Sequence, residues 1–244
     1  MKTQPIIAIK NLHKSFGNNS ILKGINLELN KGEDLVILGR SGSGKSVTIK
    51  CIVGLVKADQ GSIQISGNEI TQLKYDDLNN LRVKIGFMFQ NGALYDSMSI
   101  RQNLKFTLKH HTRDLSEEAI ESEIIEALES VGLKDAIDKM PAELSGGMQK
   151  RIALARALII KPEIILYDEP TSGLDTITAR EISELILDVQ KKYKTSSIII
   201  THDMACAKIT ANRILILKEG EIIAEGTYEE LEKSEDEWIR SFFV

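Results

Sequence analysis

Residues 39–46 read Gly-Arg-Ser-Gly-Ser-Gly-Lys-Ser and directly follow an apolar segment at 34–38. A glycine-rich turn between a strand and a helix is the pattern of a phosphate-binding loop. Its glycines let successive N–H groups point inward around phosphates, and the helix that follows presents its positive end. The pattern predicts an α/β fold with a nucleotide site. An ordinary Gly/Ser-rich turn is the alternative, but the preceding strand, the spacing of the motif and the following helix all favour the phosphate-binding loop.

A second segment far along the chain supplies the carboxylates that such a site needs. Asp168 and Glu169 end the apolar run that starts at 163, and neighbouring side chains leave a strand in opposite directions. We expect Lys45 to reach the terminal phosphates, Ser46 and Asp168 to hold Mg²⁺, and Glu169 to polarise an attacking water. Alone, the carboxylate pair is equally consistent with an acidic turn. The predicted loop contacts to nucleotide are Gly39, Ser41, Gly42, Ser43, Gly44, Lys45, Ser46 and Val47.

Apolar spacing gives the organisation of the chain. Short β-like segments fill residues 5–39, with alternation over 21–29, and a helix is expected from about 45 to 55. Residues 213–226 read as a hairpin with a Glu-Gly turn, and the last twenty residues as an amphipathic helix. Further buried strands are expected at 61–67, 85–90, 163–168 and 196–203, and a helix is expected around Ile182, Leu185, Ile186 and Val189.

The stretch from about 91 to 159 has helical rather than β spacing. Glu117 and Glu118 suit the first turn of a helix capped by Ser116 or Asp114. Apolar residues recur at helical spacing at Ile120, Ile124, Leu128 and Val131. We therefore expect one unit over residues 1–244, with a catalytic core at about 1–90 and 160–244 that is interrupted by a helical insertion at about 91–159.

Composition limits the partners and the compartment. The chain has 31 Lys plus Arg against 35 Asp plus Glu, a formal net charge of -4, so no nucleic-acid partner is expected. Cys51 and Cys206 lie in apolar, helix-like surroundings, which favours free thiols in a reducing compartment. No apolar run is long enough to span a bilayer, and the first residues lack a secretion signal. A cytoplasmic location is expected.

A third motif, Leu-Ser-Gly-Gly-Met-Gln at 144–149, opens a basic helix about twenty residues before the carboxylate strand. With the phosphate loop and the carboxylates, it resembles the ABC ATPases over almost the whole chain. The resemblance implies a P-loop NTPase (RecA-like) α/β core, an N-terminal antiparallel β subdomain and an inserted α-helical subdomain. Gln90 falls at the family's Q-loop, 172–175 at its D-loop, and His202 at its switch histidine.

The resemblance also implies a head-to-tail dimer that closes around two ATP molecules. Gln90 would sense the γ-phosphate and Mg²⁺, and His202 would bond the γ-phosphate. The signature of one copy would face the nucleotide of the other. The residues that the resemblance adds to the nucleotide site are Ser145, Gly146, Gly147 and Asp175.

Two further features, one phenylalanine and one pair of histidines, each allow both a functional and a structural interpretation. Phe16 matches the family's A-loop aromatic, where a ring stacks on adenine for roughly 1–3 kcal/mol, although a core or surface phenylalanine is the rival interpretation. The pair His110 and His111 has no carboxylate or cysteine companion and is interpreted as helix polarity rather than a metal site.

Three residues differ from those most common at the corresponding positions of the family. Met148 replaces the usual signature Gln, Val47 stands where Thr often follows the loop Ser, and Thr176 replaces a frequent Pro. Val47 removes one possible hydroxyl contact to the α-phosphate, which should modestly weaken nucleotide binding. None of the three changes removes a catalytic group.

Several segments together resemble the ATPases of MCE-type lipid transporters, called Mla in many Gram-negative bacteria. These segments are 39–50, 87–104, 143–158, 163–175 and the tail 225–243. The likeness implies an integral membrane permease, an MCE-domain lipid-binding protein, and phospholipid transport between inner and outer membranes, with this chain peripheral on the inner membrane. An ABC importer of another solute, or a soluble ABC ATPase outside transport, are the alternatives.

Residues 91–104 should border the groove that receives the permease's coupling helix. Four apolar side chains there admit either packing or docking, and two of them, Tyr95 and Met98, are the ones expected to be exposed. The four are Leu94, Tyr95, Met98 and Ile100.

Overall fold

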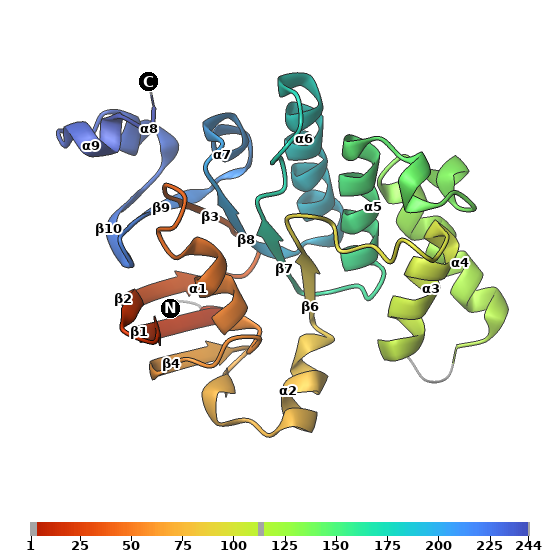
Figure 1. The fold of residues 1–244 in the computed structure, drawn as a ribbon, viewed down its shortest axis with the longest axis horizontal. Helices are drawn as coiled ribbons and strands as arrows, with labels where there is room; N and C mark the ends of the chain where they lie inside the picture. Colours follow the sequence, from red (N-terminus) through yellow and green to blue (C-terminus); the bar gives the residue numbers. More distant parts are fainter. Residues whose placement is uncertain (1–3, 112–114, 244) are drawn as a thin grey trace.

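The computed structural model describes residues 4–111 and 115–243. Two sheets and a group of helices make up the molecule (Figure 1). The four-stranded sheet has the order β2-β1-β4-β5, and the six-stranded sheet has the order β10-β9-β3-β8-β7-β6. The strands are β1 (Ile7–Phe16), β2 (Asn19–Leu29), β3 (Asp34–Leu38), β4 (Gln60–Ile65), β5 (Asn68–Glu69), β6 (Ile85–Met88), β7 (Ile164–Asp168), β8 (Ser196–Thr201), β9 (Arg213–Lys218) and β10 (Glu221–Gly226). The α/β class with an antiparallel sheet and helical parts is confirmed.

The four-stranded sheet is antiparallel and packs one face inward. β1 pairs with both β2 and β4. Along β2 the alternation of apolar residues becomes alternation of burial, with Ile25, Leu27 and Leu29 buried and the residues between them exposed. Ahead of them the alternation breaks at Gly24, whose φ of 94° is a backbone conformation that favours glycine.

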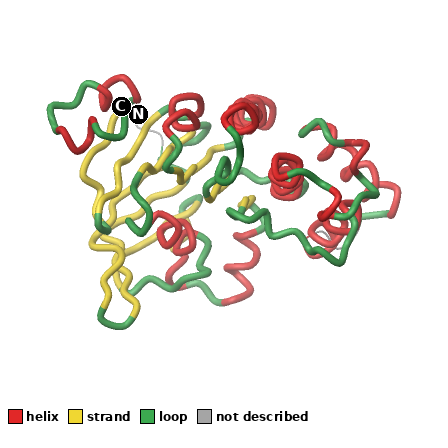
Figure 2. The backbone as a smooth tube through the Cα atoms, turned by 45° about the horizontal axis from the view of Figure 1, so that its top comes forward, coloured by secondary structure: helices red, strands yellow, loops and turns green. Residues whose placement is uncertain are grey.

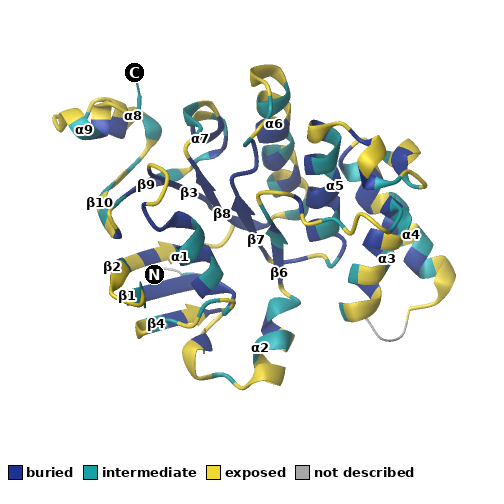
Figure 3. Cartoon of the chain, in the orientation of Figure 1, coloured by how far each residue is buried: buried dark blue, intermediate teal, exposed yellow. Residues whose placement is uncertain are grey.

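Strands β3, β6, β7, β8 and β9 run parallel, and both faces of their sheet are covered. Leu35 and Ile37 face the antiparallel sheet and α1 (Lys45–Ile52), whereas Val36 and Leu38 face α5 (Gly146–Leu158), α6 (Thr176–Tyr193) and α7 (Met204–Thr210). A strand covered on both faces is apolar along most of its length, which is why residues 35–38 and 164–167 read as continuous apolar runs. Figure 3 shows these strands as buried along their length.

The insertion is helical, as predicted, and lies at one end of the molecule beyond β6 (Figures 1 and 2). It contains α3 (Ile100–His111), α4 (Glu117–Ser130) and α5 (Gly146–Leu158). Ser116 caps α4, because its hydroxyl accepts from the Ala119 amide at 3.2 Å. The alternative cap, Asp114, lies outside the described residues. All four apolar residues predicted to share a face of this helix region are buried: Ile120, Ile124, Leu128 and Val131.

The remaining helices are α2 (Tyr75–Arg82), α6 (Thr176–Tyr193), α7 (Met204–Thr210), α8 (Tyr228–Glu232) and α9 (Glu237–Arg240). Two predictions about helices were wrong. The helix after the phosphate loop stops at Ile52 instead of Leu55, since Gly54 takes a left-handed φ of 66°. The tail forms two short helices rather than one, because Asp236 caps a new helix through the amides of Trp238 and Ile239.

The predicted hairpin is confirmed. β9 and β10 pair antiparallel, and the turn between them places Glu219 and Gly220 at φ values of 48° and 87°. Both cysteines are buried free thiols, as expected. In the described ranges, every helix is too short or too polar to cross a bilayer.

Candidate active site

The phosphate loop connects β3 to α1 and depends on left-handed glycines. Gly42 and Gly44 have φ values of 79° and 109°. A Cβ on Gly44 would lie 2.8 Å from the Leu22 Cδ2 atom and 3.2 Å from the carbonyl oxygen of Ile21. The loop is therefore pressed against β2, and the antiparallel sheet supports it from below.

A cavity of about 700 Å³ opens over this loop. Its walls come from the loop itself, from the end of β6, and from the ends of β7 and β8. The residues predicted from sequence that line the cavity are Gly39, Ser41, Gly42, Ser43, Gly44, Lys45, Ser46, Val47, Gln90, Glu169 and His202. The volume suits a nucleotide, and the lining brings together groups more than 150 positions apart in the chain.

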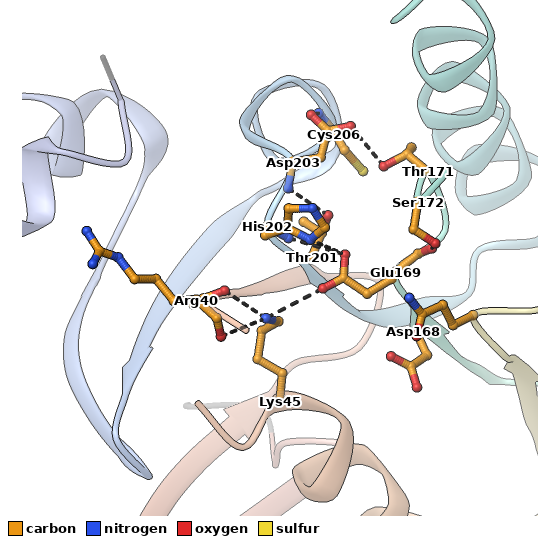
Figure 4. Close-up of polar contacts among 12 residues, drawn as sticks. Arg40, Lys45, Asp168, Glu169, Thr171, Ser172, Thr201, His202, Asp203 and Cys206 are labelled. Atoms are coloured by element: carbon orange, nitrogen blue, oxygen red, sulfur yellow. Dashed lines mark hydrogen bonds and ion pairs between the residues drawn. The ribbon is translucent and has the colours of Figure 1, made fainter. Parts of the chain in front are cut away.

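Glu169 is held between two nitrogen groups (Figure 4). Its Oε1 lies 3.5 Å from the Lys45 Nζ, and its Oε2 lies 2.8 Å from the Nδ1 atom of His202. The Lys45 ammonium also donates to the carbonyl oxygens of Gly39 at 2.7 Å and Arg40 at 3.3 Å. The carboxylate therefore faces the space above the phosphate loop, where a terminal phosphate and an attacking water would lie.

Asp168 points away from Glu169 toward α1. The Ser46 hydroxyl donates to its Oδ1 atom at 3.0 Å. Burial raises the pKa of Asp168, and the Ser46 hydrogen bond acts in the opposite direction. A hydroxyl and a carboxylate are the oxygen ligands that Mg²⁺ prefers, so this pair fits that ion. The buried Ser43 hydroxyl, in the same loop, has no hydrogen-bond partner among the described residues and is available to a phosphate oxygen.

The signature lies outside this cavity. Ser145 caps α5 by accepting from the Met148 amide at 3.3 Å, and both Ser145 and Gly146 are exposed. Gly146 instead borders a second cavity, of about 380 Å³, which it shares with Gln90 and Lys150. Within one chain, the signature and the phosphate loop therefore belong to separate surfaces.

Asp175 and Phe16 also lie outside the lining of the phosphate-loop cavity. Asp175 caps α6, accepting from the amides of Ile177 and Thr178 at 3.0 Å each. Phe16 ends β1 with 52% of its surface exposed, and the Lys14 ammonium lies 5.2 Å from its ring centroid. An exposed ring at the end of β1 can meet a planar base, and its role in adenine stacking stays a prediction.

Sequence reasoning missed part of the site. Ser241 and Phe242 from the tail line the phosphate-loop cavity. Trp238, just before them, packs its ring 4.3 Å from the Lys218 ammonium and 5.7 Å from the Arg40 guanidinium. Lys150, on α5, was also missed. The signal that could have revealed it is a charged residue on the buried face of this helix.

The segment after Gln90 divides between packing and exposure. Ile100 is fully buried and Leu94 packs on the core, whereas Tyr95 is 46% exposed and Met98 is half-buried. The predicted exposure is confirmed for Tyr95 but was wrong for Met98, which is partly buried, and Ile100 belongs to the packing. Tyr95 lines an apolar groove of about 400 Å³ together with Leu55, Phe87, Phe89, Phe106 and Ile160.

His110 and His111 lie at the end of α3 beside this groove. The His110 ring stacks at 5.9 Å on Phe106. Within residues 4–111 and 115–243, no group of three or more His, Cys, Asp or Glu residues is arranged to hold a metal ion.

A phosphate loop between a parallel strand and a helix, with two carboxylates at the end of another parallel strand of the same sheet, defines a P-loop nucleoside triphosphatase. The sequence model of the ABC transporter family matches residues 22–172. This chain therefore belongs to the ABC transporter family, as one of its ATP-binding and ATP-hydrolysing cassettes.

Relatives and solved structures agree with this placement. The chain is 39% identical over 236 residues to a probable ribonucleotide transport ATP-binding protein, mkl, of Mycobacterium leprae, covering 97% of this chain and 68% of that protein. It is 37% identical to the chloroplastic TRIGALACTOSYLDIACYLGLYCEROL 3 protein of Arabidopsis thaliana, covering 97% of this chain and 73% of that protein. It is 40% identical to the methionine import protein MetN of Brucella abortus, covering 91% of this chain and 60% of that protein.

Two solved cassettes share the fold. The ATP-binding cassette MJ0796, solved as a dimer with ADP and Pi, superposes with a TM-score of 0.83 at 34% identity, covering 91% of this chain and 98% of that one. The cassette cbiO1 of Clostridium perfringens, part of a cbiONQ transporter complex, superposes with a TM-score of 0.84 at 31% identity, covering 92% of this chain and 89% of that one.

Proposed function

We propose that this chain is the ATPase of an MCE/Mla-type transporter that moves phospholipid between the inner and outer membranes. The observation that carries the catalytic half of the proposal is the convergence of Lys45, Glu169 and His202 over the phosphate loop. Glu169 takes the proton of the attacking water, Lys45 and the loop amides bind the transferred phosphoryl group, and His202 bonds the γ-phosphate.

Ser46 and Asp168 would hold Mg²⁺ in this site, and the Gln90 side chain, which lines the same cavity, would complete its surroundings. When bound, Mg²⁺ neutralises phosphate charge that develops during transfer. The protein's own contribution is to keep Asp168 buried and aimed at the loop while Glu169 faces the opposite side.

A second copy of the chain completes each site. Ser145 and Gly146 are exposed and lie outside their own phosphate-loop cavity, so they are available to the nucleotide of a partner, and the buried Gly147 lets the helix start pack closely behind them. The start of α5 offers unpaired N–H groups and a positive end, which suit a phosphate. The solved dimer of MJ0796 shows that a cassette of this fold pairs.

The apolar groove between the core and the insertion is the proposed seat of the integral membrane permease. Tyr95 and Phe106 form an edge-to-face pair with centroids 5.2 Å apart, and 46% and 44% of their surfaces are exposed. Large exposed aromatic rings beside an apolar groove are typical of docking surfaces. This contact would hold the chain at the cytoplasmic face of the inner membrane.

The proposal of a phospholipid cargo depends on the combination of Val47, Met148 and the segment 91–104. It depends also on the resemblance of the tail to the ATPases of MCE-type lipid transporters. The Arabidopsis relative, whose name contains a glycolipid, supports a lipid cargo. The mycobacterial and Brucella relatives are named for ribonucleotide and methionine transport, which favours an importer of another solute as the second candidate.

Purification from membranes tests the cargo and the partners. We expect the chain to be recovered with a multi-span permease and an MCE-domain protein, with phospholipid bound to the complex. Recovery with a solute receptor and no lipid would support the importer. Replacing Tyr95 and Phe106 by Ser should release the chain from the permease without changing its ATP binding, and retention of the complex would refute the proposed docking groove.

A further inference from the structure

Lys150 lies outside the lining of the phosphate-loop cavity, yet its side chain bonds to three residues beside the proposed catalytic site. It lies on the first turns of α5 and is 7% exposed. Its ammonium group donates to the carbonyl oxygen of Gln90, to the carbonyl oxygen of Glu169 at 3.2 Å, and to the Ser172 hydroxyl at 3.2 Å. An ammonium group has three protons, and here each has an acceptor.

The three acceptors belong to three different parts of the site. Gln90 follows β6, Glu169 follows β7, and Ser172 lies in the turn that leads to α6. Lys150 therefore ties the helix that begins with the signature to the segment that lines the nucleotide cavity and to the backbone of the water-activating residue. Each contact spans at least 19 positions of sequence.

The backbone at Glu169 needs such support. Its φ is 50°, a left-handed conformation that is uncommon for a residue with a side chain. Its carbonyl oxygen accepts from the Ser172 hydroxyl at 2.9 Å as well as from Lys150. Uncommon conformations persist where the surroundings fix them, and they are typical of sites where a side chain must be aimed.

The segment 90–93 is bound to the same helix a second time. Arg156, six positions after Lys150 on α5, donates from its guanidinium to the carbonyl oxygens of Gly92, at 2.9 Å, and Ala93. Two cations on one helix therefore hold this segment through its backbone. A movement of α5 would carry Gln90 with it.

We propose that Lys150 is a positioning residue for ATP hydrolysis. It couples the position of α5, the helix that begins with the signature, to the orientation of the Glu169 carboxylate. The inference rests on the proposed role of Glu169 as the base. Without the ammonium group, three acceptors lose a donor in a buried site, and the peptide after Glu169 can turn. A displacement of about 1 Å in a catalytic group can cost on the order of a hundredfold in rate.

Kinetics of Lys150→Met and Lys150→Gln in the full chain test the proposal. Methionine keeps the length of the side chain and removes every donor, so kcat should fall about tenfold to a hundredfold. The KM for ATP should stay within about threefold, because the contacts of the phosphate loop are untouched. Glutamine retains two donors and should give an intermediate kcat. Lys191→Met, at an exposed position of α6, is the matched control and should resemble the unmodified protein.

Hydrogen exchange gives a readout that does not require turnover. In Lys150→Met, amides in residues 90–93 and 169–172 should exchange faster, while the two sheets keep their protection. A kcat within about twofold of the unmodified protein, or faster exchange spread evenly over the molecule, would overturn the proposal. Turnover retained in Glu169→Gln would refute the base instead, and the exchange measurement would still decide whether Lys150 holds the two segments.

Discussion

The Lys45 ammonium lies 3.5 Å from the carboxylate of Glu169, so the proposed phosphate-binding cation and the proposed base are in contact across the cavity. Their side chains are only 7% and 10% exposed, which leaves little water to screen the pair. His202 approaches the same carboxylate from the other side at 2.8 Å. Terminal phosphates of a bound nucleotide would compete with Glu169 for the Lys45 ammonium. Loss of this ion pair would free the Glu169 carboxylate to accept a hydrogen bond from water.

Glu169→Gln should separate binding from chemistry. The amide keeps the size of the side chain and cannot accept a proton, so turnover should fall about 10²- to 10⁴-fold while ATP affinity is retained. Phosphate release and equilibrium binding of ATP measure the two effects. Glu163→Gln, at the exposed start of the same strand region, is the control and should leave both unchanged. Ordinary turnover in Glu169→Gln would remove the assigned base.

Lys45→Ala should impair ATP binding itself. The substitution removes a charged donor aimed at the cavity, and the loss of such a hydrogen bond corresponds to about tenfold or more in affinity. Titration of the chain with ATP·Mg²⁺ measures the change. Lys57→Ala, at an exposed position after α1, should bind ATP as the unmodified protein does. Equal affinity in the Lys45 variant would show that the loop binds phosphate through its backbone alone.

The two signature glycines should differ in their tolerance of a methyl group. A Cβ on Gly147 would lie 2.5 Å from the Thr178 Cγ2 atom, whereas one on Gly146 would lie 3.6 Å from Leu174. Gly147→Ala should therefore lower the free energy of unfolding by about 1–3 kcal/mol, and Gly146→Ala should be neutral or slightly stabilising. Urea unfolding measures both.

A second substitution tests the cause of that difference. Thr178→Ser removes the clashing methyl group and keeps a hydroxyl for the 2.7 Å bond to Asp175. Combined with Gly147→Ala, it should restore most of the lost stability. If the double variant is as unstable as Gly147→Ala alone, the contact with Thr178 is not the reason for glycine at 147.

Asp34 should make stability depend on pH near neutrality. It is 1% exposed, and burial raises its pKa from 3.8 to about 7. Below pH 3.8 the carboxyl is protonated in both the folded and the unfolded chain. Above that pH it ionises first in the unfolded chain, so the stability it contributes is lost progressively until pH passes 7, by on the order of 4 kcal/mol.

Unfolding by urea at pH 5 and pH 8 measures this loss. Asp34→Asn cannot ionise, so the variant should lose less stability than the unmodified protein between the two pH values. Asp59→Asn is the contrasting control, because the hydrogen bond from Lys14 holds the pKa of that exposed carboxyl below its usual range. Its contribution is lost only as pH falls below 3.8, so Asp59→Asn should keep the pH dependence of the unmodified protein between pH 5 and pH 8. An identical pH dependence in Asp34→Asn and the unmodified protein would refute the titration of Asp34.

Much of the fold was predictable because the relevant signals are local. The loop at 39–46 is a contiguous pattern, and burial on both faces of the parallel sheet makes residues 35–38 continuously apolar. Helix caps are local as well, and Ser116 was one of the two caps proposed from the two acidic residues that follow it. The tail was mispredicted, since its apolar residues are divided between two short helices by a second cap at Asp236.

The sequence by itself determined the family, the positions of the phosphate loop and of most strands, and the candidate residues for the phosphate chemistry, because each of these depends on residues close together in the chain. Only the tertiary structure decided that Lys150 meets Gln90 and Glu169, that Phe242 from the tail lines the cavity, and that the signature lies away from it. The physical reason is that burial and hydrogen-bond partners are set by packing between distant segments, which no local spacing encodes.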